Sequence, residues 1–374
     1  MPELPLRPTW LEVNLPQLRS NLENIRALVA PSRVLVVLKA NAYGHGVDGV
    51  APFIAPLADY IGVALVEEAV NLRRLGVDRP ILVMGGILPE QVPAFIEYGL
   101  TLSASTPELL SAAQDTASAR KTKIRVHLKM DTGMERIGVR ENEAGPFLEE
   151  SLACRDLEIE GIFSHFANSE APDLVHARLQ LERFEEILGF YEKRNLPPPP
   201  IRHMANSGAV LQLPESYYDM VRPGLLFYGI SPVGVTARPV QVAPALTWRA
   251  RLAFSKITPP GRPVSYGSLW QSDRAVRIVT IPCGYADGYF RRMTNRAQTI
   301  VNGTKYPQVG RICMDQFMVN LGEDEARVGD GAILLGRSAS GATILAEELA
   351  EWAGTNEYEV LTSISARVPR LFLS

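Results

Sequence analysis

The sequence has few of the features that mark secreted, zinc-binding or membrane-spanning proteins. Its only three cysteines, Cys154, Cys283 and Cys313, lie far apart and form no Cys-x-x-Cys pair. An odd number of cysteines without that spacing argues against a disulfide framework and a structural zinc site. No apolar run has the length of a membrane span, and the first residues lack the basic and apolar regions of a secretory signal. We therefore expect a cytoplasmic protein without a metal.

The chain also lacks an excess of charge of either sign. Its formal net charge is −3, with 21% charged and 46% hydrophobic residues. This composition is typical of a soluble globular protein and offers no basic field to nucleic acid or to an anionic membrane. The length of 374 residues exceeds one ordinary domain and fits a large domain with a smaller one.

The first part of the chain alternates short apolar runs with helical patterns. Eight runs predict strands: Val34–Leu38, Ile61–Val66, Ile81–Met84, Leu100–Leu102, Ile124–Leu128, Ile159–Phe163, Ile201–Met204 and Asp219–Val221. Helical spacing predicts helices at Leu15–Val29, Glu67–Leu75, Pro107–Ala119 and Pro172–Arg194. Eight alternating strands predict an α/β fold, a (β/α)8 TIM-type barrel. A doubly wound open sheet is the alternative, but no Gly-x-Gly-x-x-Gly follows the first of these runs.

The last third of the chain has a different pattern. Proline becomes frequent after Pro232, and short alternating runs predict a mostly-β domain with one helix at Ile344–Trp352. The predicted strands are Ala245–Ile257, Ala275–Ile281, Thr299–Val301, Gln316–Leu321 and Gly331–Leu335. We expect a barrel domain over residues 1–235 and a β-domain over residues 236–374. A short strand at Trp10–Leu15 could pack on the second of these domains.

The most informative stretch runs from Val34 to Gly46. Five apolar residues predict a strand buried on both faces, and Lys39 stands at its end, followed by a polar turn. A lone lysine at a strand end most often extends its charge to water. A buried lysine with a depressed pKa is instead a nucleophile that can form a Schiff base with a carbonyl group. The polar residues at the ends of the later strands favour this second interpretation.

Four further barrel strands also end in cationic or hydrogen-bonding residues. The fifth ends near Lys129, the sixth at His165, the seventh at Ser207 and the eighth at Arg222. Barrel enzymes carry their chemistry at these strand ends, and the loops after strands seven and eight usually bind phosphate. A phosphate site combined with a Schiff-base lysine suggests pyridoxal 5′-phosphate, PLP. Each residue alone has an ordinary structural explanation, such as a helix cap at Ser207.

With these residues assembled, the chain resembles the alanine racemases, PLP enzymes of fold type III, over nearly its whole length. The motifs that carry the resemblance are Val37–Gly46, Lys129–Gly138, Ser164-His165, Ala205–Ser207, Val221–Gly224, Ser265–Gly267, Gly284–Gly288 and Cys313–Asp315. The resemblance implies a barrel with a β-domain, paired head to tail in a homodimer with shared active sites. It also implies interconversion of L- and D-alanine, with D-alanine supplied for peptidoglycan synthesis.

The resemblance also implies a role for individual residues. Lys39 would carry the PLP, and Tyr266 would be the second base, serving the partner's cofactor. Residues implied at the phosphate are Tyr43, Asn206, Ser207, Gly224, Leu225 and Tyr358. Arg222 would face the pyridine nitrogen, with His165 beside it. Residues implied at the substrate are Arg136, Tyr285, Met314 and Asp315, and Lys129 is where the family often carries a carbamate.

Racemisation removes a proton from one face of Cα and returns one to the other, so two bases are expected. Lysine and tyrosine side chains ordinarily have pKa values of about 10, so the surroundings of Lys39 and Tyr266 must favour the deprotonated forms if these residues are to act as bases near neutral pH. Nearby cations such as Arg136 and Arg222 favour both the neutral amine and the tyrosinate.

Three alternatives remain open. A broad-specificity or serine racemase would share every motif. A decarboxylase of this fold would usually place an acid at the ring nitrogen, where Arg222 stands. A non-catalytic PLP-binding protein would need only the barrel and Lys39, so the β-domain with Tyr266 argues against it.

Overall fold

The computed structural model describes residues 5–232 and 239–374. These residues form two compact units. The barrel unit comprises residues 18–42, 47–232 and 239–243, and the β unit comprises residues 5–17, 43–46 and 244–374. The expected domain boundary near residue 235 lies outside the described residues.

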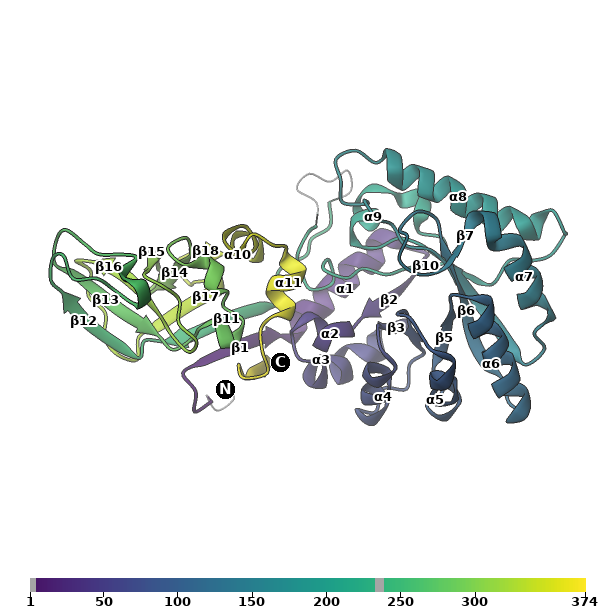
Figure 1. Ribbon diagram of the computed structural model, residues 1–374, viewed down its shortest axis with the longest axis horizontal. Helices are drawn as coiled ribbons and strands as arrows, with labels where there is room; N and C mark the ends of the chain where they lie inside the picture. The colour runs from purple at the N-terminus through teal and green to yellow at the C-terminus, as the bar shows by residue number, and fades with distance from the viewer. Residues whose placement is uncertain (1–4, 233–238) are drawn as a thin grey trace. The chain divides into compact units, whose positions relative to one another are not determined.

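The barrel unit is built on parallel strands in the order β10-β2-β3-β4-β5-β6-β8-β9 (Figure 1). Their bounds are β2 (Arg33–Val37), β3 (Tyr60–Val63), β4 (Ile81–Val83), β5 (Thr101–Ala104), β6 (Ile124–Asp131), β8 (Leu157–Phe163), β9 (Ile201–His203) and β10 (Met220–Val221). The short β7 (Val139–Arg140) pairs with β6. Two backbone hydrogen bonds join the ends of this sheet, from Asp219 N to Arg202 O (3.0 Å) and from Arg222 N to Ala205 O (2.8 Å). The barrel is thereby nearly closed.

Helices lie outside these strands (Figure 1). They are α1 (Leu15–Val29), α3 (Val47–Ile54), α4 (Val66–Arg74), α5 (Val92–Glu97), α6 (Pro107–Ala119), α7 (Ala144–Ala153), α8 (Val175–Glu192) and α9 (Ser207–Gln212). A capping side chain sets the start of some of them. At α6, the Thr106 side chain accepts a hydrogen bond from Leu109 N (3.2 Å), and Pro107 occupies the first turn.

The β unit contains one large twisted sheet. Its strand order is β12-β13-β16-β15-β14-β17-β11-β1-β19, and β18 pairs with β17. The bounds are β1 (Thr9–Asn14), β11 (Leu246–Arg251), β12 (Phe254–Thr258), β13 (Val276–Ile281), β14 (Gln298–Val301), β15 (Thr304–Val309), β16 (Phe317–Gly322), β17 (Gly331–Arg337), β18 (Thr343–Ile344) and β19 (Arg370–Leu373). Two helices, α10 (Ala346–Ala353) and α11 (Glu357–Thr362), complete this unit.

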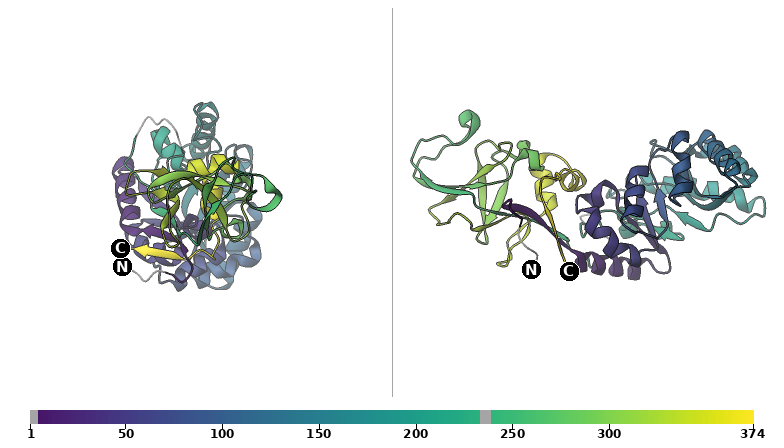
Figure 2. Two further views of the ribbon diagram at one scale, coloured as in Figure 1. Left: turned by 90° about the vertical axis from the view of Figure 1, so that its left-hand side faces the viewer. Right: turned by 90° about the horizontal axis from the view of Figure 1, so that it is seen from below.

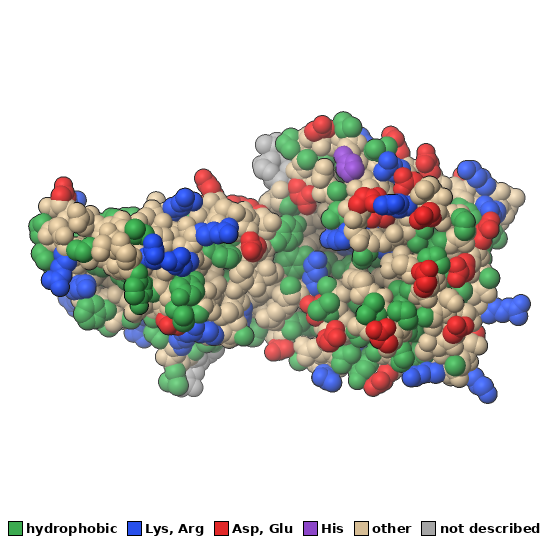
Figure 3. All heavy atoms as spheres, in the orientation of Figure 1, with side chains coloured by type: hydrophobic (Ala, Val, Ile, Leu, Met, Phe, Trp, Pro, Cys, Tyr) green, Lys and Arg blue, Asp and Glu red, His purple; other side chains and the backbone are tan. Residues whose placement is uncertain are grey.

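The first and last strands of the chain lie side by side (Figure 1 and Figure 2). Strand β1 runs antiparallel to β11 and parallel to β19, so residues near both chain ends belong to the β unit. Apolar side chains such as Leu11 and Trp248 are buried there. On the face shown in Figure 3, basic and acidic side chains are interspersed, in keeping with the small net charge.

The predicted fold class, a (β/α)8 barrel followed by a mostly-β domain, is confirmed. Several elements differ in detail. The expected run Ala245–Ile257 forms two strands, β11 and β12, and the expected helix Pro172–Arg194 begins later as α8. None of the helices among the described residues is long and apolar enough to cross a membrane.

Candidate active site

Lys39 follows β2 directly and begins the short turn α2 (Lys39–Tyr43). The next residues, Ala40 to Tyr43, have φ angles between 50° and 56°, which is a left-handed turn of four successive non-glycine residues. Such a turn is strained and needs support from its surroundings. Glu68 supplies part of it, because its Oε1 atom accepts a hydrogen bond from Ala40 N at 2.7 Å. The Asn41 side chain accepts another from Val47 N at 2.8 Å.

The surroundings of Lys39 favour its neutral form. Burial, followed by the positive charge of Arg136, lowers the pKa of Lys39, while the negative charge of Glu68 acts in the opposite direction. A partly neutral amine at the end of a barrel strand is suited to attack a carbonyl carbon or to take a proton.

Arg222 lies deep in the barrel unit, with 4% of its surface exposed. Its Nη1 atom donates to His203 Nδ1 (2.9 Å), and its Nη2 atom donates to the carbonyl oxygens of Ser164 (2.8 Å) and Met204 (3.1 Å). Nη2 also lies 3.2 Å from His165 Nδ1. Burial lowers the pKa of Arg222 to about 9, so the guanidinium is still charged at neutral pH. Its Nε atom donates to none of the described residues.

Lys129 is buried at 3% exposure, and its Nζ atom donates to Met130 O at 2.7 Å. Nζ also lies 5.1 Å from the centre of the Phe163 ring. Burial and the positive charge of Arg222 lower the pKa of Lys129 to about 7. The amine is therefore neutral in a large fraction of molecules at neutral pH.

Asp131 organises the loop that carries Arg136. Its carboxylate accepts backbone hydrogen bonds from Gly133 (2.8 Å), Met134 (2.9 Å) and Arg136 (3.1 Å). The Arg136 side chain itself is exposed. The loop is thus fixed at its base while its arginine stays accessible.

The start of α9 lies against the turn that follows β10. The Ser207 hydroxyl oxygen accepts hydrogen bonds from Gly224 N (2.8 Å) and Leu226 N (3.2 Å). The structure therefore brings Ser207, Gly224 and Leu225 together. Asn206 caps α9, because its Oδ1 atom accepts hydrogen bonds from Ala209 N (3.1 Å) and from the Ser169 hydroxyl (2.6 Å).

His165 joins this group through Arg222 and is partly buried. Burial, and after it the positive charge of Arg222, holds the pKa of His165 well below its ordinary value. The imidazole is therefore neutral at physiological pH and can pack against a ligand without adding charge.

The remaining predicted residues belong to the β unit and form two groups there. In the first group, the rings of Tyr43 and Tyr358 lie 5.9 Å apart between centroids. Burial raises the pKa of Tyr43, so its hydroxyl stays protonated and can donate a hydrogen bond. Tyr358 is carried by α11, which lies next to the Tyr43–Gly46 segment because Gly44 approaches Leu361 O closely.

The second group surrounds an open pocket of about 460 Å³. Four predicted residues line it, namely Tyr266, Tyr285, Met314 and Asp315. Tyr266 is 69% exposed, which leaves its hydroxyl accessible to a proton donor or acceptor from outside this unit. The Ser265 hydroxyl donates to Arg311 O at 2.6 Å and fixes the turn before Tyr266.

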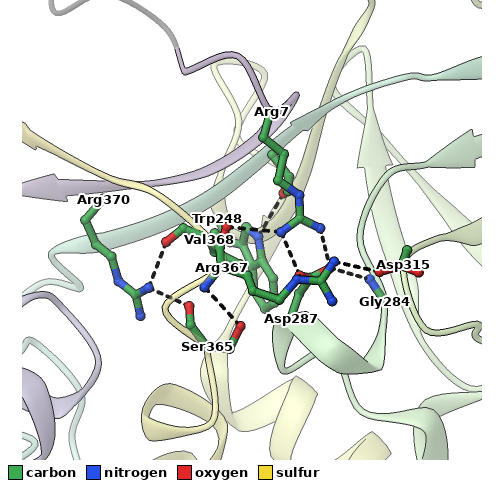
Figure 4. Close-up of polar contacts among 10 residues, drawn as sticks. Arg7, Trp248, Gly284, Asp287, Asp315, Ser365, Arg367, Val368 and Arg370 are labelled. Carbon is green, nitrogen blue, oxygen red and sulfur yellow. Dashed lines mark hydrogen bonds and ion pairs between the residues drawn. The ribbon is translucent and has the colours of Figure 1, made fainter.

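A cluster of charges that was not predicted holds the Met314–Asp315 segment (Figure 4). Asp287 is fully buried, and its carboxylate accepts two hydrogen bonds from Arg7, each of 2.7 Å. Arg367 lies 3.6 Å from the same carboxylate and donates to Asp315 Oδ1 at 2.6 Å. The turn that contains Asp287 also holds the loop directly, because Ala286 N donates to Met314 O at 3.0 Å.

Gly44 and Arg370 are two further residues that the sequence did not single out for a role. Gly44 has φ = 78°, and a Cβ atom there would lie 2.1 Å from Leu361 O, so only glycine fits. Arg370 donates to Gly44 O (3.0 Å) and to the carbonyl oxygens of Ile364 (2.7 Å) and Ser365 (2.6 Å). Arg370 therefore fastens the segment of Tyr43 to the end of α11. The Tyr-Gly-His-Gly pattern after Lys39 was the one local signal of this contact.

Comparison with known proteins agrees with the predicted fold and family. A family profile described as "Alanine racemase, N-terminal domain" matches residues 13–232, and one described as "Alanine racemase, C-terminal domain" matches residues 245–372. The chain is 42% identical to the alanine racemase of Carboxydothermus hydrogenoformans over 371 residues. This match covers 98% of the chain and 100% of that relative.

Solved structures give the same result. The crystal structure of the alanine racemase from Streptomyces lavendulae, a producer of D-cycloserine, has a TM-score of 0.93 and 36% identity; the match covers 100% of this chain and 98% of that one. A histidine racemase from Leuconostoc mesenteroides has a TM-score of 0.89 and 28% identity, with 100% of both chains covered. Racemases with a different named substrate thus share the fold.

Proposed function

The chain belongs to the alanine racemase family, a family of isomerases, and we propose that it interconverts L- and D-alanine with pyridoxal 5′-phosphate as cofactor. The observation that carries this proposal is Lys39, which stands at the end of a barrel strand in surroundings that lower its pKa. We further propose that the product D-alanine supplies peptidoglycan synthesis in the cytoplasm. The three free cysteines are consistent with that compartment.

The barrel residues fit this cofactor in charge and in hydrogen-bonding capacity. Lys39 would hold its aldehyde carbon, and the unused Nε–H of Arg222 would donate to the pyridine nitrogen. Ser207, Gly224 and Leu225, with the capped helix at Asn206, would hold the phosphate, as would the hydroxyls of Tyr43 and Tyr358. His165 would lie beside the ring. The bound cofactor supplies an electron sink that makes the Cα proton of an amino acid acidic.

Two bases of this chain would move the proton. When it is not bound to the cofactor, the Lys39 amine would take a proton from one face of Cα or return a proton to that face. The exposed Tyr266 hydroxyl would serve the opposite face. One base cannot reach both faces of a fixed substrate, so each residue would remove the Cα proton of one enantiomer and return a proton to the carbanion that the other residue forms from the opposite enantiomer.

Arg222 would decide which reaction follows proton removal. An arginine donates hydrogen bonds and keeps its proton, and the pKa of about 9 leaves Arg222 charged at neutral pH. It therefore would not protonate the pyridine nitrogen fully, which keeps the ring a weaker electron sink. A weaker sink limits side reactions such as transamination.

Arg136 would bind the carboxylate of the substrate, because it is the accessible cation on the loop fixed by Asp131. Lys129, whose pKa of about 7 leaves much of its amine neutral, is suited to react with carbon dioxide. The resulting carbamate would be an anion close to Arg136. It would orient the guanidinium toward the substrate.

We also propose that the active protein is a homodimer with shared sites. The pocket of Tyr266, Tyr285, Met314 and Asp315 lies wholly in the β unit, while Lys39 lies in the barrel unit. In the arrangement that the family resemblance implies, this pocket would serve the barrel of the partner. Tyr285, Met314 and Asp315 would then shape substrate access.

A panel of L-amino acids tests the proposed substrate. Alanine should racemise with the highest kcat/KM, ahead of serine and histidine. Purified protein should be yellow, and borohydride should fix the cofactor to the peptide that contains Lys39. A higher kcat/KM for serine would favour the broad-specificity alternative, to which the histidine racemase of the same fold lends support. Label on another lysine, or no label, would contradict the assignment of Lys39.

A further inference from the structure

A row of buried polar side chains extends from Arg222 through the interior of the barrel. Arg222 Nη1 lies 2.9 Å from His203 Nδ1, and His203 Nε2 lies 2.8 Å from His127 Nδ1. His127 Nε2 faces Glu160 Oε2 at 3.6 Å, which is within ion-pair range but too long for a hydrogen bond. Tyr60 donates its hydroxyl to the same carboxylate oxygen at 2.9 Å. His127 and His203 are both fully buried.

The two ends of this row determine where each proton lies. A guanidinium can only donate, so His203 Nδ1 must accept and His203 carries its proton on Nε2. That proton is donated to His127 Nδ1, so His127 also carries its proton on Nε2. The Nε2–H of His127 then points toward the carboxylate of Glu160, which can only accept. The two hydrogen bonds from Arg222 to His203 and from His203 to His127 therefore have the same direction, and the remaining N–H of His127 faces the anion at 3.6 Å.

The surrounding structure holds both imidazole rings in place. The Phe163 ring stacks on His203 with a centroid distance of 4.6 Å and an angle of 8°. A Cβ atom at residue 161 would lie 2.5 Å from His127 Nδ1, so Gly161 leaves room that the imidazole fills. The pairing of β6 with β8 shifts at the same point, because Val126 pairs with Ile159 and His127 with Gly161. Glu160 is thus the extra residue of a β-bulge, a feature that redirects a side chain.

The charges around the row keep both imidazoles neutral. Burial and then the charge of Arg222 hold the pKa of His203 well below its ordinary value. Burial lowers the pKa of His127 as well, although Glu160 opposes that change. The other charged or titratable groups that face the row are Lys129, Arg125, His165 and Tyr60. Burial would raise the pKa of Glu160, but His127, Tyr60 and Arg125 together bring it below its ordinary value.

We propose that His203, His127 and Glu160 are positioning residues that hold Arg222 charged and oriented toward the cofactor ring. This proposal rests on the proposed function, since it assumes that Arg222 faces the pyridine nitrogen. The carboxylate at one end balances the buried guanidinium at the other, and the two neutral imidazoles between them allow only one direction of hydrogen bonding. Moving the proton of His203 to Nδ1 would place it against the donor of Arg222. Moving the proton of His127 to Nδ1 would place it against the donor of His203.

The first test is independent of catalysis. Imidazole ¹⁵N spectra of histidine-labelled protein, recorded as purified and with added PLP, should show His127 and His203 as neutral Nε2–H tautomers from pH 6 to 8. Finding either residue as the Nδ1–H tautomer, or as a cation at pH 7, would overturn the proposal even if the protein racemises alanine. Failure to racemise alanine with both tautomers as expected would instead contradict the proposed function alone.

The second test breaks the row at its centre. His127→Phe keeps an aromatic ring between Tyr60 and Phe163 but removes the acceptor for His203, whereas His127→Asn retains an acceptor. We expect His127→Phe to lower kcat by about 10- to 100-fold, because His203 is left with an unsatisfied buried donor and no longer holds Arg222 in one orientation. The KM for alanine should change little, since no residue of the row touches substrate. In the ¹⁵N spectrum, His203 should remain the Nε2–H tautomer, because Arg222 still donates to its Nδ1 atom, but its Nε2 signal should shift when the hydrogen bond to His127 is lost. His127→Asn should restore much of kcat and of the Nε2 signal.

The third test removes the charge at the far end of the row. Glu160→Gln should shift the basic limb of the kcat profile to lower pH, because Arg222 loses its balancing anion. Glu158→Gln, an exposed glutamate on the same strand, should leave the profile unchanged. If His127→Phe folds, keeps kcat within about twofold and leaves the Nε2 signal of His203 unchanged, the residues have no positioning role. If the pH profile of kcat for Glu160→Gln is not shifted, Glu160 has no part in positioning Arg222.

Discussion

Substitution of Asp287 by asparagine tests whether the buried charge cluster stabilises the β unit. Asp287 is fully buried, and Arg7 donates two hydrogen bonds of 2.7 Å to its two oxygens. Its Oδ2 atom also accepts a hydrogen bond from Gly284 N at 2.9 Å. Asparagine keeps one acceptor oxygen but loses the charge and places a donor amide group against a guanidinium. Arg7 and Arg367 then lose their shared counter-charge.

The expected loss of stability follows from this burial. Removing one partner of a buried ion pair costs about 3–5 kcal/mol, whereas an exposed pair contributes about 1 kcal/mol or less. Arg7 is 25% exposed, so water compensates part of the loss, and we expect about 3 kcal/mol. For a unit of roughly 150 residues, each kcal/mol shifts Tm by about 2–4 °C, which predicts a decrease of about 6–12 °C. Thermal unfolding followed by circular dichroism measures this shift.

A matched control comes from an exposed ion pair of the same unit. Glu323 lies 3.6 Å from Arg274, and these side chains are 82% and 68% exposed. Glu323→Gln should therefore change Tm by less than about 2 °C. Asp287→Asn should also raise the KM for alanine, because the turn at Asp287 holds the backbone of Met314. Equal Tm shifts in the two variants would refute the reasoning from burial.

Three further predictions concern residues that we propose act in catalysis. Arg222→Glu should slow racemisation and increase the yield of pyruvate from transamination, because a carboxylic acid can protonate the pyridine nitrogen; an unchanged ratio of pyruvate to racemised alanine would refute the role assigned to Arg222. Lys39→Ala and Tyr266→Phe should each be nearly inactive, and a mixture of the two after subunit exchange should regain about a quarter of the wild-type sites, as random pairing in a two-fold dimer predicts. If mass spectrometry shows exchange and no activity returns, the sites are not shared. Because the neutral amine is the form that reacts and the pKa of Lys129 is lowered to about 7, a ¹³C carbamate signal from labelled bicarbonate should rise between pH 6 and 8 and then level off. A signal that persists in Lys129→Ala, or one that keeps rising toward pH 10, would contradict this assignment.

The sequence predicted those features that depend on local pattern. The apolar run before Lys39 predicts a strand that is buried on both faces. The observed strand β2 coincides with this run to within one residue at each end. The helices α1 and α6 begin and end where their apolar spacing and capping residues indicate. The polar residues after the barrel strands were recognisable because each interrupts an apolar run. These residues lie close together in the barrel unit because the parallel strands of a barrel end at the same rim.

Features that depend on distant partners could not be predicted in this way. Arg7 is 280 residues from Asp287 in the sequence, Arg367 is also distant from it, and none of the three stands in a pattern that indicates burial. His127 was counted as part of an apolar strand, since one histidine in such a run does not reveal a partner 76 residues away. The left-handed turn after Lys39 contains two alanines and a tyrosine, which rarely adopt positive φ, beside one asparagine, which does so more readily, so its surroundings must specify most of it.

Conversion of L-alanine in D₂O tests the central claim most directly. Wild-type protein should turn pure L-alanine into an equal mixture of enantiomers, because the two are equal in free energy, and deuterium should appear at Cα. Lys39→Ala should produce neither change, and Glu158→Gln should behave as wild type. If the protein binds PLP but alanine keeps both its configuration and its Cα proton, the chain is a PLP-binding protein without racemase activity, and the proposed two-base mechanism is wrong.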